Sequence, residues 1–389
     1  MGISLGVVGL GSFGSEFVQL FTNHPLVDRI ALCDREPERV AEFAKRDWIR
    51  DKFHDSDAYA SLNDMCKSDL DAIAIITQPW LHAPQAVQVM ESGKHVYSAV
   101  PVIWIPDGDE ILDWCDRIIG TCRRTGMRYM LGETTYYRPE SMYCRRRAAE
   151  GAFGDFVYAQ GEYYHDVDNP YSNLREVTRS RMASTAGDEW AKESRKYEQR
   201  GVHSGPMHYP THSTSGPICV MRAHAVKVAA FPYYVRTPDD HFGEEPANET
   251  ALFTMSNGAV MRICEYRKIG LPGRETFQLY GTEGSYENQR WCDRASYTDL
   301  TVDEMRDPLP SEVMAAFSRN QSGEGVYGGH GGCHAYLVHE FVDAVAHNRM
   351  PVINAWEAAR YMTPGVMAHK SALRDGERLD VPDWGDAPG

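Results

Sequence analysis

Over the first third of the chain, segments with the hydrophobic pattern of strands alternate with segments that have the pattern of helices. Short apolar runs typical of buried strands lie at residues 3–11, 29–34, 71–77, 95–100 and 128–133. Between them, residues 15–21, 36–46, 83–93 and 109–126 have the spacing and end signals of helices. Strands that alternate with helices favour right-handed βαβ units and a parallel sheet that binds ligands at its carboxyl edge.

The pattern changes after about residue 135. Longer strand-like runs occupy residues 155–166 and 225–235, and two strands flank Asn257-Gly258, a strong hairpin signal. Residues 276–288 have the pattern of another hairpin, and two helical stretches follow at residues 335–348 and 355–373. We therefore predict an α/β protein with two domains. A parallel domain at residues 1–135 precedes a domain at residues 136–389 that has a large, mostly antiparallel sheet.

A long polar segment, residues 166–208, interrupts the second domain. Connections of this length in compact domains are usually functional loops or partly disordered segments. The segment contains Trp190 and several arginines, which suit sugar stacking and hydrogen bonding. We expect it to shape the access of a substrate, with Trp190 as a substrate-binding residue.

Charge and composition narrow the class of protein. The chain has 55 acidic and 40 basic residues, and its net charge of −15 disfavours binding to nucleic acid, whose phosphates need a basic surface. No apolar run reaches membrane-spanning length, and the first residues lack a secretory pattern. The nine cysteines are scattered without a CxxC pair, which fits reduced thiols. We expect a cytoplasmic protein without nucleic-acid or membrane partners.

Three glycines follow the first predicted strand in a dinucleotide-binding pattern. Gly9, Gly11 and Gly14 have G-x-G-x-x-G spacing and open a helix, so that backbone can approach a pyrophosphate. Asp34 ends the next strand, where it would accept hydrogen bonds from ribose hydroxyls and repel a 2′-phosphate. This pattern predicts a Rossmann domain that binds NAD, although the neighbouring Arg35 could hold the extra phosphate of NADP. The competing interpretation is a Rossmann-like domain that has lost its ligand.

The chain also resembles the Gfo/Idh/MocA family of oxidoreductases over nearly its whole length. The resemblance rests on "GLGSFG", on "TQPWLHAPQAVQVMESGKHVYSAVP", on "LYGTEGS" and on the stretch from residue 339 to residue 373. It implies a Rossmann domain followed by a large antiparallel-sheet domain, carbohydrate substrates, and a homodimer or homotetramer. It also implies that Thr77, Gln78, Pro79 and His82 line the cofactor. With the turn and the strand ends, the expected NAD contacts are Gly9, Gly11, Ser12, Phe13, Gly14, Asp34, Arg35, Thr77, Gln78, Pro79, His82, Ser98 and Glu133.

One departure from the family pattern affects the chemistry. Most members carry Glu-Lys-Pro where this chain has Ala99-Val100-Pro101, and their lysine helps to move the substrate proton. Some relatives without that lysine are NAD-dependent α-N-acetylgalactosaminidases. The chain resembles these enzymes at five residues, and the resemblance implies that the five line the substrate pocket. The resemblance is weaker at His330, which is a candidate substrate contact. The five are Glu133, Tyr163, His165, Tyr209 and His212.

The same residues can be interpreted from their own chemistry. Tyr163 and His165 lie two apart on a predicted strand, so their side chains share a face. A phenol or an imidazole can relay a hydroxyl proton, and histidine titrates near neutrality. We predict that His212 accepts the substrate proton, with help from Tyr209, Tyr163 or His165. The alternative for Tyr163 and His165 is half-buried packing. Zinc is disfavoured at the loosely spaced His203, His208 and His212, so no metal is expected.

Three functions remain open at this stage. The first is an NAD-dependent oxidoreductase that takes hydride from a ring hydroxyl carbon of a sugar or glycoside. The second is an NAD-dependent glycosidase, in which transient C3 oxidation acidifies the C2 hydrogen and permits elimination, hydration and re-reduction. The third is a non-catalytic NAD or sugar sensor, kept open by the valine at position 100.

Overall fold

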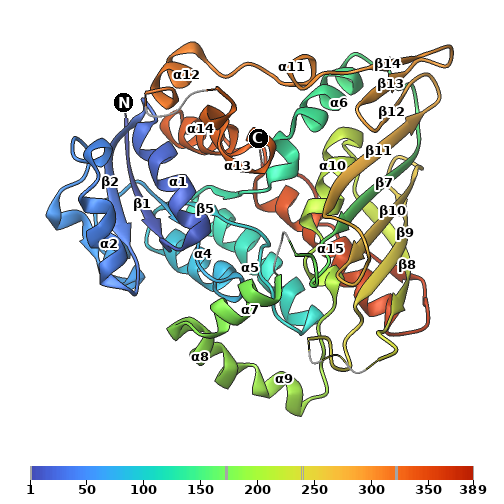
Figure 1. Ribbon diagram of the computed structural model, residues 1–389, viewed down its shortest axis with the longest axis horizontal. Coiled ribbons are helices and arrows are strands. Elements are labelled where there is room, and N and C mark those ends of the chain that lie inside the picture. Colours follow the sequence, from blue (N-terminus) through green and yellow to red (C-terminus); the bar gives the residue numbers. More distant parts are fainter. Residues whose placement is uncertain (1, 171–173, 238, 240, 320–322, 389) are drawn as a thin grey trace.

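The computed structural model describes residues 2–170, 174–237, 239, 241–319 and 323–388. Its strands form two separate sheets, one of six and one of nine strands. Figure 1 shows the first sheet and its helices at the amino-terminal end of the molecule and the second sheet at the opposite side, with α15 between them. The predicted α/β fold with a parallel and a mostly antiparallel sheet is confirmed.

The first sheet has the strand order β3-β2-β1-β4-β5-β6, and every pair in it is parallel. Its central strands are buried on both sides, because helices cover both faces. The strands are β1 Ile3–Val8, β2 Val27–Cys33, β3 Ala58–Tyr59, β4 Ala72–Ile75, β5 His95–Ser98 and β6 Tyr129–Leu131. The helices are α1 Ser12–Asn23, α2 Pro37–Ala44, α3 Leu62–Cys66, α4 His82–Glu91 and α5 Gly108–Thr125.

The second sheet has the order β14-β13-β12-β11-β7-β10-β9-β8-β15. Of the pairs within it, only β7 with β10 is parallel in the described part of the chain. The strands are β7 Phe156–Tyr164, β8 Ala225–Tyr233, β9 Asn248–Met255, β10 Val260–Tyr266, β11 Arg274–Gly281, β12 Ser285–Glu287, β13 Arg290–Cys292, β14 Tyr297–Asp299 and β15 Leu379–Asp380.

Two buried helices cover the inner face of the second sheet. Helix α10 (Thr211–Met221) packs on β7 and β11, and all of its residues are buried. Helix α15 (Ala355–Ala372) packs on β8 and also on α5, so it joins the two domains. The remaining helices are α6 Pro139–Ala149, α11 Val302–Met305, α12 Ser311–Phe317, α13 Gly329–Gly332 and α14 His334–Ala346.

The polar segment at residues 166–208 is not a structureless connection. It contains α7 (Leu174–Met182), α8 (Thr185–Glu193) and α9 (Arg195–Gln199), which lie below α4 and α5 in Figure 1. Residues 171–173 of this segment lie outside the described residues. Within the described ranges, no helix is both long enough and apolar enough to cross a membrane.

Candidate active site

The turn after β1 has the geometry that a dinucleotide needs. A side chain at Gly14 would place its Cβ 1.9 Å from the carbonyl oxygen of Gly9, and Gly9 itself has a φ of 91°. Gly11 precedes α1, and no side chain caps the helix there. Its own Cβ position meets only Arg39, at 3.8 Å. The helix start thus leaves its first amide groups uncapped by side chains, as a helix that binds a pyrophosphate requires.

Asp34 lies at the carboxyl end of β2 and is held in place by backbone. Its carboxylate accepts hydrogen bonds from the amides of Leu10 at 2.6 Å and Glu36 at 2.9 Å. Arg35 turns away and pairs with Glu189 of α8 at 2.6 Å. The cation that lies nearest to the carboxylate is Arg39, at 3.5 Å, and the sequence analysis missed it. These residues fit the adenosine end of NAD, with Asp34 available to ribose hydroxyls.

The other residues expected to contact the cofactor lie at or after the carboxyl ends of strands or at the start of α1, and several make hydrogen bonds within the protein. His82 is buried and its ring nitrogens lie 2.9 Å from the Pro101 oxygen and 3.1 Å from the Thr77 oxygen, so it braces two loops of the crevice. Thr77 donates to Gln85 at 2.6 Å. Ser98 is fully buried and donates to the Ala99 carbonyl at 3.1 Å. Gln78 precedes the short 3-10 helix η3 (Pro79–Leu81), and Ser12 and Phe13 begin α1.

A buried ion pair joins the two domains at the carboxyl edge of β6. Glu133, with no exposed surface, follows β6, and its Oε1 lies 2.9 Å from Nδ1 of His212 on α10. Burial alone would lower the pKa of His212, but the charges of Glu133 and Glu275 outweigh it and raise it to about 9. His212 is therefore an imidazolium at neutral pH, whereas the sequence analysis expected a group that titrates near neutrality. The described contacts leave its Nε2 without a protein partner.

Glu275 on β11 is a second carboxylate that the sequence analysis missed. Its Oε1 lies 3.5 Å from Nδ1 of His212 and accepts from the Thr135 hydroxyl at 2.9 Å, and its Oε2 lies 2.5 Å from Arg138. It stands opposite Tyr163 in the pairing of β11 with β7. The negative charges of two acidic side chains thus stabilise the protonated form of one imidazole, which explains why the pKa of His212 is raised.

Tyr163 and His165 face the same side, as their spacing predicts. The Tyr163 hydroxyl lies 2.9 Å from Nδ1 of His165, and the phenol ring packs 5.1 Å from the His212 ring. Burial, followed by the charge of Arg267, lowers the pKa of His165 to about 4, so the imidazole is neutral at physiological pH. A neutral ring at this position can accept the Tyr163 proton.

A second row of side chains holds Tyr163 in place. Arg267 lies 4.7 Å over the Tyr163 ring and pairs at 2.8 Å with Glu265, the neighbour of Tyr163 across β10. Glu265 also accepts a hydrogen bond from Ser213 of α10, and burial raises its pKa to about 7. Alternation along β10 and β11 puts Glu265 and Glu275 on the buried face with apolar neighbours, and that pattern is the signal that could have found them.

Tyr209 and Val100 close the site on the Rossmann side. The Tyr209 hydroxyl donates to the Val100 carbonyl at 3.4 Å, and its ring packs 5.6 Å from His212. Burial raises the pKa of Tyr209 to about 12. The tyrosine and histidine residues of the second domain thus meet the strand end that carries valine in place of lysine.

His330 lies in the glycine-rich turn of α13 and contacts the nucleotide turn. Its ring packs edge-on against Phe13 at 5.6 Å, and its Nδ1 lies 2.9 Å from Nε2 of His334. Burial, and then the charge of His212, lowers the pKa of His330. It therefore stands within electrostatic reach of the His212 cluster, beside the start of α1.

Trp190 is not brought into this cluster. It stacks on Trp80 at 5.3 Å with an angle of 18° between the rings, and it lines a separate cavity next to α5. Arg181 of α7, in the same segment, acts on the site through its charge. Burial lowers the pKa of His82 and Arg181 adds to this, whereas burial raises the pKa of Tyr209 and Arg181 opposes it.

The cluster separates its titratable groups into a donor and an acceptor. His212 carries a proton at neutral pH, whereas His165 is neutral and lies within hydrogen-bonding distance of Tyr163. Groups whose environments push their pKa values apart are suited to opposite roles in proton transfer. The arrangement can therefore give one proton and take another within a single site.

Both the amino-terminal domain and the fold as a whole are similar to known proteins. Residues 3–133 match the Gfo/Idh/MocA family, described as "Oxidoreductase family, NAD-binding Rossmann fold". A glycosyl hydrolase family 109 protein of Shewanella sp. is 28% identical over 170 residues, which cover 42% of this chain and only 36% of that relative. One from Bacteroides thetaiotaomicron is 23% identical over 430 residues, or 98% of this chain and 84% of the relative.

A solved structure extends the similarity to the whole fold. Levoglucosan dehydrogenase in complex with NADH and L-sorbose superposes with a TM-score of 0.72 at 18% identity, over 98% of this chain and all of that one. The family match confirms the predicted NAD-binding Rossmann fold and favours an enzyme over a sensor. Residues 3–133, the amino-terminal domain of the chain, are thus similar to the Gfo/Idh/MocA family of NAD-binding oxidoreductases.

Proposed function

We propose that this protein oxidises a ring hydroxyl of a sugar or glycoside with NAD. The observation that carries the proposal is the pairing of protonated His212 with the neutral Tyr163–His165 couple at the carboxyl edge of the Rossmann sheet. When bound, NAD supplies the hydride acceptor. The sugar class of the substrate is supported by the relatives named as glycosyl hydrolases and by the sugar complex of the solved neighbour.

The residues divide the proton chemistry between them. Tyr163 accepts the substrate hydroxyl proton while its own proton passes to Nδ1 of His165, at 2.9 Å. His212 donates its Nε2 hydrogen to a substrate oxygen, and Glu133 keeps the ring charged and oriented. This assignment reverses the role that the sequence analysis gave to His212, because two carboxylates keep that imidazole protonated.

A second candidate is hydrolysis of a glycoside by transient oxidation. Elimination from an oxidised sugar needs a base for the C2 hydrogen and an acid for the departing oxygen. A single site with a fixed donor, His212, and a neutral acceptor couple, Tyr163–His165, supplies both groups. The names of the relatives favour this candidate as well.

One experiment tests the proposal and separates the two candidates. Purified protein is incubated with NAD and a panel of methyl and nitrophenyl glycosides, while reduced nicotinamide and released sugar are measured together. Stoichiometric accumulation of reduced nicotinamide supports net oxidation. Sugar release without net reduction, lost when the cofactor is stripped, supports hydrolysis. No change in either quantity with any glycoside refutes both.

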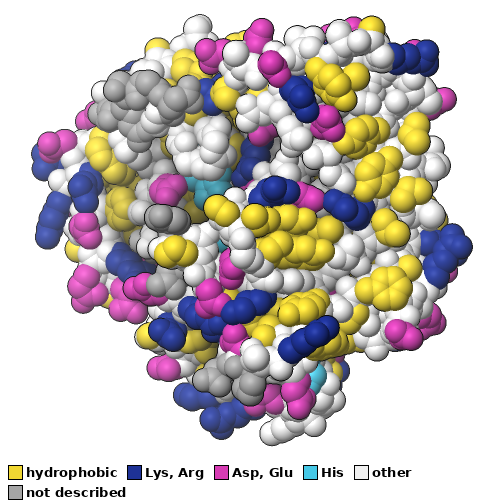
Figure 2. All heavy atoms as spheres, turned by 45° about the vertical axis from the view of Figure 1, so that its right-hand side comes forward, with side chains coloured by type: hydrophobic (Ala, Val, Ile, Leu, Met, Phe, Trp, Pro, Cys, Tyr) yellow, Lys and Arg dark blue, Asp and Glu magenta, His cyan; other side chains and the backbone are white. Residues whose placement is uncertain are grey.

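We also propose that the protein works as a homo-oligomer in the cytoplasm. The outer face of the nine-stranded sheet exposes apolar side chains, among them Phe231 at 59% and Leu252 at 52%. Figure 2 shows hydrophobic side chains gathered over this side of the molecule. A second copy packed on this face would cover them. All nine cysteines are free thiols, which suits a reducing compartment.

A further inference from the structure

A cavity of about 390 Å³ lies outside the catalytic cluster, between the Rossmann helices and the α8–α9 segment. Its volume falls in the range of about 300–1,000 Å³ that is typical of small-molecule pockets. None of Gly9, Gly14, Asp34 or His212 lines it. The cavity is therefore distinct from both the dinucleotide turn and the catalytic residues.

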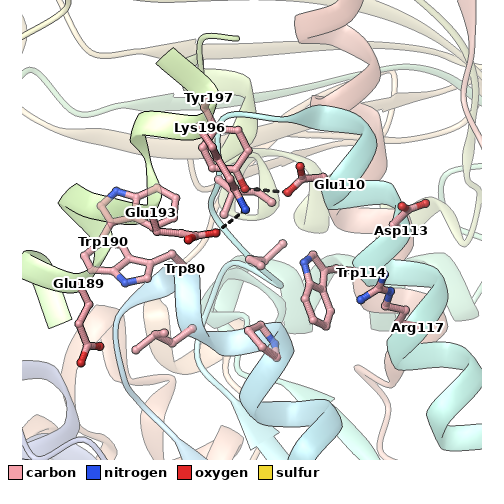
Figure 3. Close-up of a pocket in the computed structure, with 14 residues that line it drawn as sticks. Trp80, Glu110, Asp113, Trp114, Arg117, Glu189, Trp190, Glu193, Lys196 and Tyr197 are labelled. Carbon is pink, nitrogen blue, oxygen red and sulfur yellow. Dashed lines mark hydrogen bonds and ion pairs between the residues drawn. The ribbon is translucent and has the colours of Figure 1, made fainter. Parts of the chain in front are cut away.

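Aromatic rings form its walls. Figure 3 shows Trp80 and Trp190 on one side of the cavity and Trp114 of α5 on the other, with Tyr197 above them. Three of the eight tryptophans in the chain are thus collected in one pocket. Apolar side chains, including Leu81, complete the lining. Rings arranged in this way offer flat apolar faces to a flat apolar ligand surface.

The polar residues of the cavity are largely neutralised by one another. Glu110 accepts from the Tyr197 hydroxyl at 2.7 Å and from Arg200 at 3.1 Å, and Glu193 pairs with Lys196. In the described part of the chain, Asp113 has no side-chain partner. The pocket thus offers hydrogen-bonding carboxylates, but little uncompensated negative charge.

The positions of the cations decide what kind of ligand fits. Arg117 lies 4.8 Å over the Trp114 ring, and Lys196 lies 4.8 Å over the Tyr197 ring. An organic cation would meet these like charges at the same rings that should attract it. A neutral, hydroxyl-rich ring meets no such repulsion. It can stack one face on indole while its hydroxyls donate to Asp113 and accept from Arg117.

We propose that this cavity is a second carbohydrate-binding site, which holds a neutral sugar residue away from the catalytic cluster. Trp114 and the stacked pair of Trp80 and Trp190 contact the faces of the sugar, and Asp113 accepts its hydroxyl hydrogens. The role in sugar binding that the sequence suggests for Trp190 is thereby placed at this site. The proposal concerns binding alone and does not depend on the proposed reaction.

The test uses NAD-saturated full-length protein on an array of neutral mono- and oligosaccharides. His212→Ala serves as the background, so that binding is measured without turnover. Trp114→Ala in this background should lower the affinity at least about tenfold, equivalent to roughly 1.4 kcal/mol. Trp48→Ala is the matched control, because Trp48 is also half-buried but lies outside the cavity, and it should bind like the background.

Several results would overturn the proposal. The first is that no glycan binds in a way that depends on Trp114. The second is that tetramethylammonium binds instead and depends on the same tryptophan. The third is that the glycan binds to cofactor-free protein but not to NAD-saturated protein, because the cavity would then belong to the cofactor site. The proposed reaction fails separately, through the absence of reduced nicotinamide and of sugar release in the glycoside panel.

Discussion

Removing the charge of Glu133 should take the proton from His212 at neutral pH. A pKa of about 9 in place of the ordinary 6.5 corresponds to about 3 kcal/mol in favour of the imidazolium. At an effective dielectric constant of about 20, a carboxylate 2.9 Å away contributes about 6 kcal/mol. The attraction that the substitution removes is larger than the net stabilisation of the imidazolium, so Glu133→Gln should bring the pKa of His212 to 6.5 or lower.

The assay is a proton NMR titration of the histidine ring resonances. His212 is assigned by the signal that is missing from His212→Ala. Glu249→Gln is the matched control, because Glu249 is equally buried and pairs with His369 at 2.7 Å, so it should shift His369 and leave His212 unchanged. A wild-type His212 that titrates between about 6 and 7, or a value near 9 that survives Glu133→Gln, would refute the reasoning.

The same pair predicts a pH-dependent contribution to stability. Because the folded pKa of His212 is raised, its contribution is fully present below pH 6.5 and is lost as the pH rises through about 9. Denaturant unfolding of wild type should therefore weaken over that alkaline window by up to about 3 kcal/mol. A flat profile for wild type between these limits would show that the ion pair is not formed in solution.

Three further variants test other parts of the site. Asp34→Asn keeps the acceptor but removes the charge, so titration with both cofactors should show the preference for NAD over NADP falling by roughly tenfold. An unchanged preference would show that Arg39 already neutralises the carboxylate. Val100→Lys places an ammonium on the residue whose carbonyl binds Tyr209, so steady-state kinetics should show lower turnover, and a higher turnover than wild type would contradict this. Leu252→Glu puts charges on the outer sheet face, so light scattering should report dissociation into monomers.

Much of the fold can be predicted from the sequence, because its strands and amphipathic helices have clear periods. Helix α10, which carries His212, could not be predicted in this way. All of its residues are buried, so no polar face marks the helical period, and Thr, Ser, Gly and Pro residues give it low helix propensity. Helix α7 was missed for the opposite reason, since it has no buried residue and therefore no apolar stripe.

The candidate site was only partly visible in the sequence. The spacing of Tyr163 and His165 predicts their shared face, which the 2.9 Å contact shows. The protonation state of His212 could not be predicted, because it depends on Glu275, a residue 63 positions away that strand pairing brings beside Tyr163. Electrostatic environments of this kind arise from tertiary contacts, which a single sequence does not display.

The central claim is that the second domain supplies the proton chemistry that the Rossmann strand lacks. Its most direct test is a single-turnover measurement of reduced nicotinamide formation, with NAD-loaded protein and its best glycoside, for wild type and Tyr163→Phe. The lost hydroxyl contacts only His165 among the described hydrogen-bond partners, so the fold should persist. The account predicts a rate lower by about 10²–10⁴-fold in the variant. A rate equal to that of wild type would contradict it.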